Sequence, residues 1–121
     1  MGRKRLLIVE DSAVQFQLLA AGLKGAGYDV VVARDGVQSI SLVRQQRPDL
    51  ILLDIELPAG GGYLVLERLK SLGVPLPVIA MSARPAEKER EKMLAAGADD
   101  YFEKPIEFER LTKRIQELLG D

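Results

Sequence analysis

Five polar side chains come at or just after the ends of short apolar runs in the sequence. They are Glu10, Asp11, Asp54, Ser82 and Lys104. Three carboxylates brought close together repel one another, and one like-charge pair ~4 Å apart costs roughly 4 kcal/mol at an effective dielectric of 20. A hard divalent cation relieves that repulsion, and an all-oxygen ligand set suits Mg²⁺ or its substitute Mn²⁺. The acids therefore predict a divalent cation site, provided that the fold brings them together.

Asp54 carries the most specific chemistry of this set. It ends the apolar run 50–53, so its carboxylate is expected at the edge of a buried strand. A carboxylate can attack phosphorus and hold the group as an acyl phosphate. The oxygens of the transferred group need positive charge and hydrogen-bond donors, which the cation, Lys104 and Ser82 would supply. Each residue alone is more commonly a helix cap, a turn residue or a solvated lysine, so the prediction of phosphoryl chemistry depends on the whole set.

Strands and helices alternate along the chain by their hydrophobic periodicity. Continuous apolar runs predict buried strands at 6–9, 30–33, 50–53, 78–81 and 101–102. Helical spacing predicts a helix after each run, with Ser12 opening the first, Asp35 capping the second and Pro85 in the first turn of the fourth. The faces expected to be buried are Val37, Ile40 and Val43 in the second helix and Phe108, Leu111, Ile115 and Leu118 in the fifth.

Five strand–helix repeats with nearly continuous apolar strands are typical of a parallel sheet that helices cover on both faces. Right-handed crossovers then produce a doubly wound α/β fold, a three-layer sandwich. In such sheets the ligand site lies beyond the carboxyl ends of the strands. This fold would therefore bring the five polar side chains to one edge.

Length and composition exclude several classes of function. A chain of 121 residues, 47% of them hydrophobic, predicts one folded domain over residues 1–121. With 17 basic and 18 acidic residues, the net charge of −1 gives no reason to expect direct nucleic-acid or membrane binding. The sequence has no cysteine and no histidine, which excludes thiol chemistry, histidine-ligated zinc and a phosphohistidine on this chain. No signal peptide or membrane-spanning run is evident, so we expect a cytoplasmic protein.

The ordered motifs resemble the receiver domain of two-component response regulators, the CheY-like family, over essentially the whole chain. Each motif alone is weak, but their order and spacing are specific. The resemblance implies the strand order 2-1-3-4-5. The matching segments are 7–12, 48–58 with Gly62 following, 78–83 and 97–105.

The resemblance assigns the metal and phosphoryl residues position by position. Glu10 and Asp11 match the metal-binding acid pair, with glutamate where aspartate is commoner, and Asp54 matches the phosphoacceptor. Glu56 stands where the family uses a backbone carbonyl as a metal ligand, and Lys104 matches the phosphate-binding lysine.

Three further positions match the family's switch and its backbone. Ser82 matches the switch hydroxyl and Tyr101 the switch aromatic, which would turn from exposed to buried on phosphorylation. Lys104–Pro105 matches a peptide bond that is usually cis in the family.

The implied function is phosphoryl acceptance with Mg²⁺, from a sensor histidine kinase, a phosphotransfer protein or a small phosphodonor. Such a domain phosphorylates and dephosphorylates itself and turns over no substrate, so it is not an enzyme in the ordinary sense. The resemblance also implies an output partner or dimer mate on the face of the fourth helix, fifth strand and fifth helix.

Two other functions are compatible with parts of the sequence. A receiver-like module could bind partners without being phosphorylated. A haloacid-dehalogenase-type phosphohydrolase also uses an aspartate at a strand end with an acid two residues later, as in Asp54 and Glu56, and Asp99 and Asp100 could then supply its metal-binding acids.

Two local features allow alternative predictions. Glu56 and Arg84 are expected to overhang the phosphoryl site, where an ion pair between them would obstruct the attacking water. The alternative is that both side chains point into solvent. Phe16 is either an exposed docking residue or is buried by a shift in the helix phase.

Overall fold

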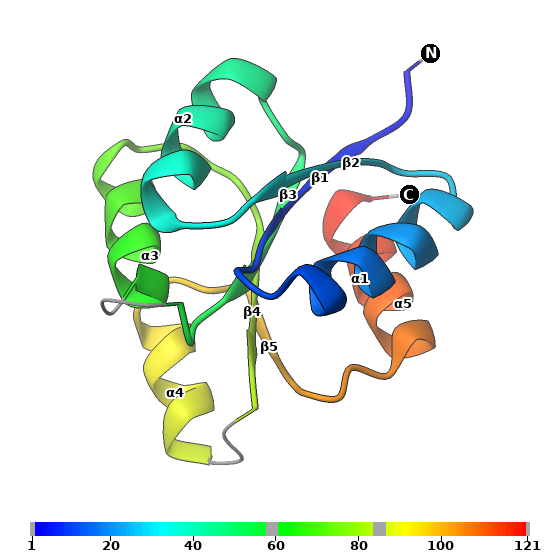
Figure 1. Cartoon of the computed structure of the whole chain (residues 1–121). Coiled ribbons are helices and arrows are strands. Elements are labelled where there is room, and N and C mark those ends of the chain that lie inside the picture. Colours follow the sequence, from blue (N-terminus) through cyan, green and yellow to red (C-terminus); the bar gives the residue numbers. More distant parts are fainter. Residues whose placement is uncertain (1, 58–60, 84–86, 121) are drawn as a thin grey trace.

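The structure is a computed structural model, and it describes residues 2–57, 61–83 and 87–120. Strands and helices alternate without exception along these residues, as predicted (Figure 1). The strands are β1 (Arg5–Val9), β2 (Asp29–Ala33), β3 (Leu50–Asp54), β4 (Val78–Ser82) and β5 (Asp100–Glu103). The helices are α1 (Ala13–Gly25), α2 (Gly36–Gln46), α3 (Gly61–Ser71), α4 (Glu87–Ala95) and α5 (Phe108–Leu119).

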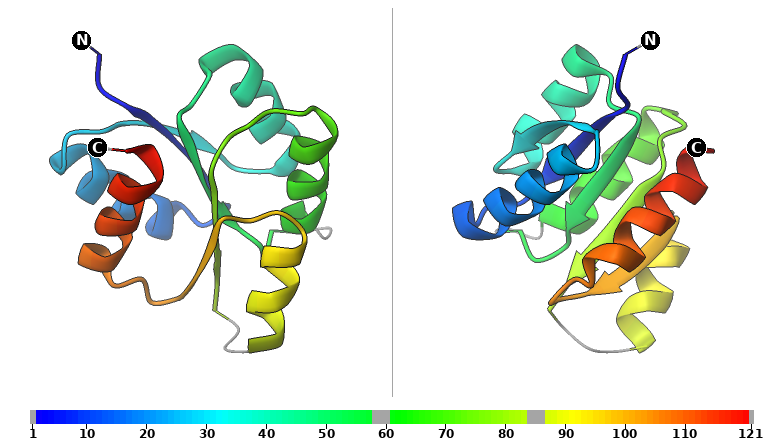
Figure 2. Two further views of the ribbon diagram at one scale, coloured as in Figure 1. Left: turned by 180° about the vertical axis from the view of Figure 1, so that it is seen from behind. Right: turned by 90° about the vertical axis from the view of Figure 1, so that its right-hand side faces the viewer.

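The five strands form one parallel sheet in the order β2-β1-β3-β4-β5. Helices α1 and α5 cover one face of the sheet, and α2, α3 and α4 cover the other (Figures 1 and 2). The molecule is therefore the three-layer α/β sandwich, with the strand order, that the sequence and the resemblance predicted.

Two apolar layers hold the sheet between its helices. Alternate residues of β1 point to opposite faces, so Leu7 and Val9 join the layer under α2 and α3, whereas Leu6 and Ile8 join the layer under α1 and α5. All residues of β3 and β4 are buried. A polar side chain at the end of either strand is therefore held against a rigid apolar support.

The predicted caps are in place. The Ser12 hydroxyl accepts a hydrogen bond from the backbone of Gln15 at 3.4 Å, and the Asp35 carboxylate accepts one from Gln38 at 2.7 Å. These bonds satisfy N–H groups of the first turn, so each helix begins immediately after its strand and loop. Cap chemistry thus fixes where the chain turns away from the carboxyl edge of the sheet.

The predicted buried face of α2 was partly wrong. Val43 is buried and Ile40 is half-buried, but Val37 is 85% exposed. The physical reason is the helical repeat: at 3.6 residues per turn, positions six apart lie roughly 120° from each other around the axis. Val37 therefore points away from the layer that Val43 joins.

Phe16 of α1 is neither the fully exposed nor the fully buried residue that the sequence allowed. The ring is half-buried and packs against the layer under α1 and α5. The Arg34 guanidinium lies 5.4 Å from the centroid of the ring.

Among the described helices, none has the length and apolar character needed to cross a bilayer.

Candidate functional site

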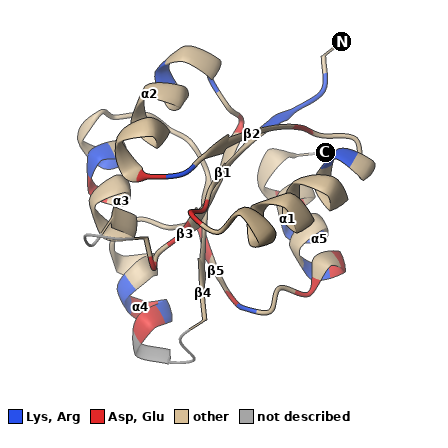
Figure 3. Ribbon diagram, viewed as in Figure 1, with Lys and Arg blue, Asp and Glu red and all other residues tan. Residues whose placement is uncertain are grey.

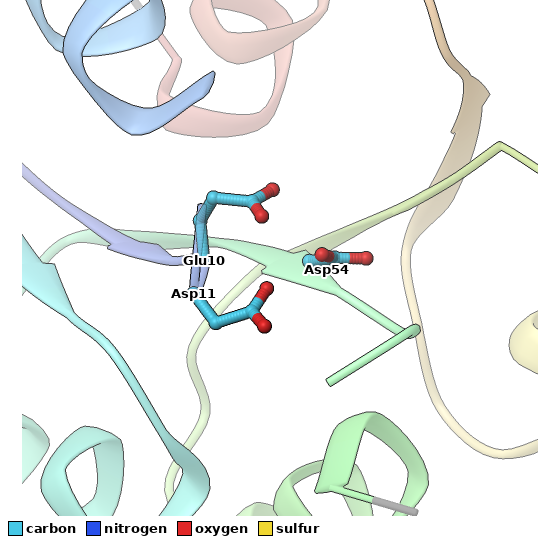
Figure 4. A group of neighbouring side chains, drawn as sticks. All are labelled: Glu10, Asp11 and Asp54. Carbon is cyan, nitrogen blue, oxygen red and sulfur yellow. The ribbon is translucent and has the colours of Figure 1, made fainter. Parts of the chain in front are cut away.

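Three carboxylates meet at the carboxyl ends of β1 and β3. Glu10, Asp11 and Asp54 each offer an oxygen, and these oxygens lie within 4.8 Å of one another. Figure 4 shows the carboxylates of Glu10 and Asp11 pointing to the side where Asp54 lies, and Figure 3 shows acidic segments just after β1 and at the end of β3 adjoining at this edge. Glu10 and Asp54 are each only 3% exposed, whereas Asp11 is exposed. The fold thus assembles the predicted acid cluster with one solvent-facing member.

Lys104 closes the cluster from the loop after β5. Its ammonium lies 3.0 Å from a Glu10 oxygen and 3.3 Å from an Asp54 oxygen. It also donates a hydrogen bond to the side-chain oxygen of Gln15 at 2.6 Å. One cation is therefore shared by two buried carboxylates that would otherwise repel each other.

The pKa values of the two bonded partners are both raised. Burial is the main cause for Glu10, and the nearby charge of Asp54 adds to it, while the hydrogen bond from Lys104 opposes the shift. For Lys104, burial alone would lower the pKa, but the bond to Glu10 and the charges of Asp54 and Glu10 outweigh it. The site therefore holds its ammonium strongly and has an excess of negative charge.

Backbone and neighbouring side chains orient the acids. The Ser12 N–H donates to Glu10 at 3.2 Å, and the Glu56 N–H donates to Asp54 at 2.9 Å. The Arg34 guanidinium donates to the backbone carbonyl of Asp11 at 3.0 Å. These bonds leave carboxylate lone pairs directed toward the shared centre.

Gly62 lets α3 approach the loop that leaves the site. A Cβ placed on Gly62 would lie 2.3 Å from the Cα of Ile55, the residue after Asp54. Such a distance is not tolerated between a side chain and backbone. Only glycine allows this packing, which fixes the path of the chain directly after Asp54.

The three acids fit a divalent metal ion of the Mg²⁺ type. All their donor atoms are carboxylate oxygens, two of the residues are buried, and the exposed third leaves room for water ligands. Mg²⁺ prefers such oxygen ligands and retains several waters. The donor set therefore agrees with the cation that the sequence predicted.

Ser82 and Glu56 meet on the other side of Asp54. Ser82 at the end of β4 is 0% exposed, and its hydroxyl donates to the Glu56 carboxylate at 3.1 Å. The backbone N–H of Ala83 donates to the same carboxylate oxygen. Arg84, the expected ion-pair partner of Glu56, lies outside the described residues, as does Pro85.

Tyr101 is buried, with 6% of its surface exposed. Burial raises its pKa, and a hydrogen bond with Ser82 works in the opposite direction. In this structure the aromatic ring thus has the inward orientation, near the hydroxyl at the site. The Lys104–Pro105 peptide bond is cis, as the resemblance implied.

Asp99 and Asp100 lie at the other end of the sheet, before and at the start of β5. Asp99 accepts a hydrogen bond from the Val78 N–H, and Asp100 pairs with Arg114 at 2.7 Å. Neither belongs to the acid cluster. The arrangement that a phosphohydrolase would require from these two acids is therefore not formed among the described residues.

Besides the bond from Ser82 to Glu56, two contacts bring in residues that the sequence analysis had not placed at the site. Gln15 bonds Lys104, and Arg34 bonds the backbone of Asp11. Both contacts join residues from different elements, and Gln15 lies in a helix away from any strand end. Their one sequence signal is adjacency, because Gln15 lies in the first helical turn after the acid pair and Arg34 directly follows the second strand.

The same combination of fold and motifs occurs in known proteins. The family described as the response regulator receiver domain matches residues 6–116. A response regulator named MprA from a Mycobacterium species is 39% identical over 115 residues, which are 95% of this chain and 50% of that protein. The chain thus spans about half the length of the curated relatives it matches.

Solved structures agree with this match. The receiver domain of a Francisella response regulator superimposes with a TM-score of 0.92 at 27% identity, covering 98% of both chains. A CheY-like response regulator receiver domain protein from Methanospirillum hungatei has a TM-score of 0.90 at 28% identity, covering 98% of this chain and 95% of that one. Because the family model matches most of its length, the chain belongs to the receiver domain family of two-component response regulators.

Proposed function

We propose that Asp54 accepts a phosphoryl group and that residues 1–121 act as one phosphorylation-controlled domain. A carboxylate oxygen of Asp54 attacks phosphorus while the bond from phosphorus to the leaving group breaks; an acyl phosphate then leaves as its carboxylate, and a phosphohistidine as an imidazole that takes its proton from water. The observation that carries this proposal is the position of Asp54. It is buried, oriented by the Glu56 N–H, and faces both the acid pair and the Lys104 ammonium.

Each neighbour of Asp54 has a distinct role in this proposal. Glu10, Asp11, Asp54 and the backbone carbonyl of Glu56 would hold Mg²⁺ or Mn²⁺. The ion supplies positive charge that neutralises the transferring oxygens. Lys104 would move from its carboxylate partners to a phosphoryl oxygen, and the Ser82 hydroxyl would donate to another.

The phosphodonor is proposed to be a sensor histidine kinase, a phosphotransfer protein or a small acyl phosphate. The chain has no histidine, so a phosphohistidine can come only from a partner. Helix α1 presents the exposed apolar residues Val14 and Leu18. Leu18 also lines a groove that reaches Lys104 at the site mouth. A protein donor seated on this surface would be placed beside Asp54.

The output is proposed to pass through Ser82 and Tyr101 to the face formed by α4, β5 and α5. The Ser82 hydroxyl lies close enough to Tyr101 to influence its pKa, so a hydroxyl drawn toward a phosphoryl group would alter the surroundings of the ring. The structure has the inward ring; an outward ring in the unphosphorylated population is part of the proposal. An output partner or dimer mate would bind this face, and direct nucleic-acid binding by this domain is not expected.

Incubation with labelled acetyl phosphate and Mg²⁺ tests the proposal. We expect one phosphoryl group per chain, lost when the metal is chelated and absent from Asp54→Asn. Asp49→Asn changes the same charge at the opposite end of the sheet and should be labelled like wild type. Normal labelling of Asp54→Asn, or no labelling of wild type, would refute the assignment. Turnover of a phosphomonoester by the protein would favour the phosphohydrolase instead.

A further inference from the structure

Two hydrogen-bond donors beside Asp54 converge on a single carboxylate oxygen. The Ser82 hydroxyl and the Ala83 N–H both donate to Oε1 of Glu56, the first at 3.1 Å. A charged acceptor makes stronger hydrogen bonds than a neutral one. The end of β4 is therefore an anion-binding site, and in this structure the anion it binds belongs to the protein itself.

This anion-binding pair lies next to the reacting carboxylate. Asp54 and Met81 are register partners in adjacent strands, and the Ile55 N–H bonds the Met81 carbonyl at 3.0 Å. Neighbouring strands are ~4.8 Å apart, so the two donors, one and two residues beyond Met81, adjoin the position of a group bonded to Asp54. A phosphoryl oxygen and the Glu56 carboxylate would thus require the same donors.

The two acceptors exclude each other. A serine hydroxyl has one proton to donate, and a backbone amide has one. Both protons are directed to Glu56. In addition, the Glu56 carboxylate brings a further negative charge toward the place where the phosphoryl charge develops, which raises the electrostatic cost of that group.

We propose that Glu56 is a tethered competitor of the phosphoryl group: its carboxylate occupies Ser82 and Ala83, and must release both before they can bind a phosphoryl group on Asp54. This inference rests on the proposed function of Asp54. In this role the Glu56 side chain opposes formation of the phosphoryl-bound state and needs no partner cation. A gate against water would instead slow loss of the phosphoryl group. Glu56 thereby sets how much of the phosphoryl-bound state is populated.

The competition is coupled to the aromatic ring behind Ser82. Tyr101 is buried, and its side chain lies near enough to the Ser82 hydroxyl, from which Glu56 accepts, to influence the pKa of the phenol. Release of the hydroxyl by Glu56 therefore changes one of the contacts that hold Tyr101. The free-state position of Glu56 and the environment of the ring are thus linked through Ser82.

Binding of beryllofluoride with Mg²⁺, measured by titration, tests this competition without phosphoryl transfer. We expect Glu56→Gln to bind more tightly than wild type because the charge is lost, and Glu56→Ala to bind about tenfold or more tightly because the acceptor is lost too. Glu103→Gln is the matched control. It removes one negative charge from the residue in register with Ser82 and should leave the affinity unchanged.

A second measurement examines the contact itself, without metal or beryllofluoride. In NMR spectra, the Ala83 amide proton should shift upfield and exchange faster with water in Glu56→Ala but not in Glu103→Gln, because only the first loses the acceptor. Unchanged or weaker beryllofluoride binding in both Glu56 variants, beside a wild type that binds it, would overturn the competition and leave the proposed function intact. A wild type that neither binds beryllofluoride nor becomes phosphorylated would overturn both.

Discussion

The two ends of the sheet use carboxylates in opposite ways. At the amino end, Asp49 and Asp99 each precede a strand and bond the first residue of a neighbouring strand. Asp49 accepts from the Arg5 N–H and Asp99 from the Val78 N–H, both at 2.8 Å. Their own N–H groups bond the carbonyls of the same two residues. Each acid therefore fastens one strand to the next.

At the carboxyl end, the acids face each other. Glu10 and Asp54 are buried, share the Lys104 ammonium, and lie beside Asp11. Three of the four buried polar side chains among the described residues, Glu10, Asp54 and Ser82, lie at this end. Residue type alone therefore does not separate a structural acid from a chemical one; the end of the strand at which the acid lies, and the partners it finds there, do.

The largest expected effect comes from removing the shared cation. Lys104→Met leaves two buried carboxylates without their ammonium, so the free energy of unfolding without Mg²⁺ should fall by about 3 kcal/mol. Added Mg²⁺ should restore most of it, because a bound cation replaces the lost charge. Denaturant unfolding with and without Mg²⁺ measures both effects, with Lys113→Met on the exposed part of α5 as the control. Equal stability of Lys104→Met and wild type would show that the acids do not depend on this lysine.

Metal affinity separates the two ends directly. Glu10→Gln should weaken Mg²⁺ binding by at least the roughly 10–100-fold that loss of an outer-shell partner costs, since Glu10 is proposed as a direct ligand. Asp49→Asn removes the same charge at the amino end and should leave Mg²⁺ binding unchanged. Isothermal titration of the two variants makes the comparison. Similar losses in both would mean that Mg²⁺ responds to net charge and has no specific site.

A smaller effect is expected at the amino end. Asp99→Ala removes the acceptor of the Val78 N–H and should lower the free energy of unfolding by about 1 kcal/mol. Asp99→Asn keeps a side-chain oxygen and should stay near wild type. Neither variant should alter phosphorylation by acetyl phosphate. Loss of phosphorylation in Asp99→Asn would place this acid in the reaction and contradict its purely structural role.

The smallest effect concerns Tyr101, which lies in β5 between the two ends. Burial raises its pKa above the unfolded value of 10.0, so the folded chain retains the proton to higher pH. Its contribution to stability is present below that value and is lost as the pH rises through the folded-state pKa. Unfolding measured above pH ~10 should therefore show a shallower decline for Tyr101→Phe than for wild type. Parallel declines would mean that the folded environment does not favour the neutral phenol.

The sequence predicted the fold and the acid cluster because both depend on strand periodicity. Apolar runs located β3 and β4, and the rule that ligands bind beyond strand ends placed Asp54 near Glu10. Asp99 and Asp100 were open to a second interpretation, because a sequence shows an acid beside a strand but not the partner it bonds. The structure identifies those partners as Val78 and Arg114.

Contacts between side chains of separate elements could not be predicted. The bond from Ser82 to Glu56 and the bond from Lys104 to Gln15 depend on side-chain conformations chosen after the layers pack. Val37 is exposed because of its angle around α2. The prediction grouped apolar residues three apart and did not take that angle into account. Periodicity determines which face a residue occupies, whereas packing determines what it touches.

The most direct test of the central claim locates the phosphoryl group itself. The protein is treated with acetyl phosphate and Mg²⁺ and then with borohydride, which reduces an acyl phosphate to an alcohol and so converts the modified aspartate to homoserine. Tandem mass spectrometry of the digested chain then finds the altered residue. We expect homoserine at position 54 alone, and none after chelation of the metal. Homoserine at Asp49, Asp99 or Asp100, or a digest with no altered aspartate, would contradict it.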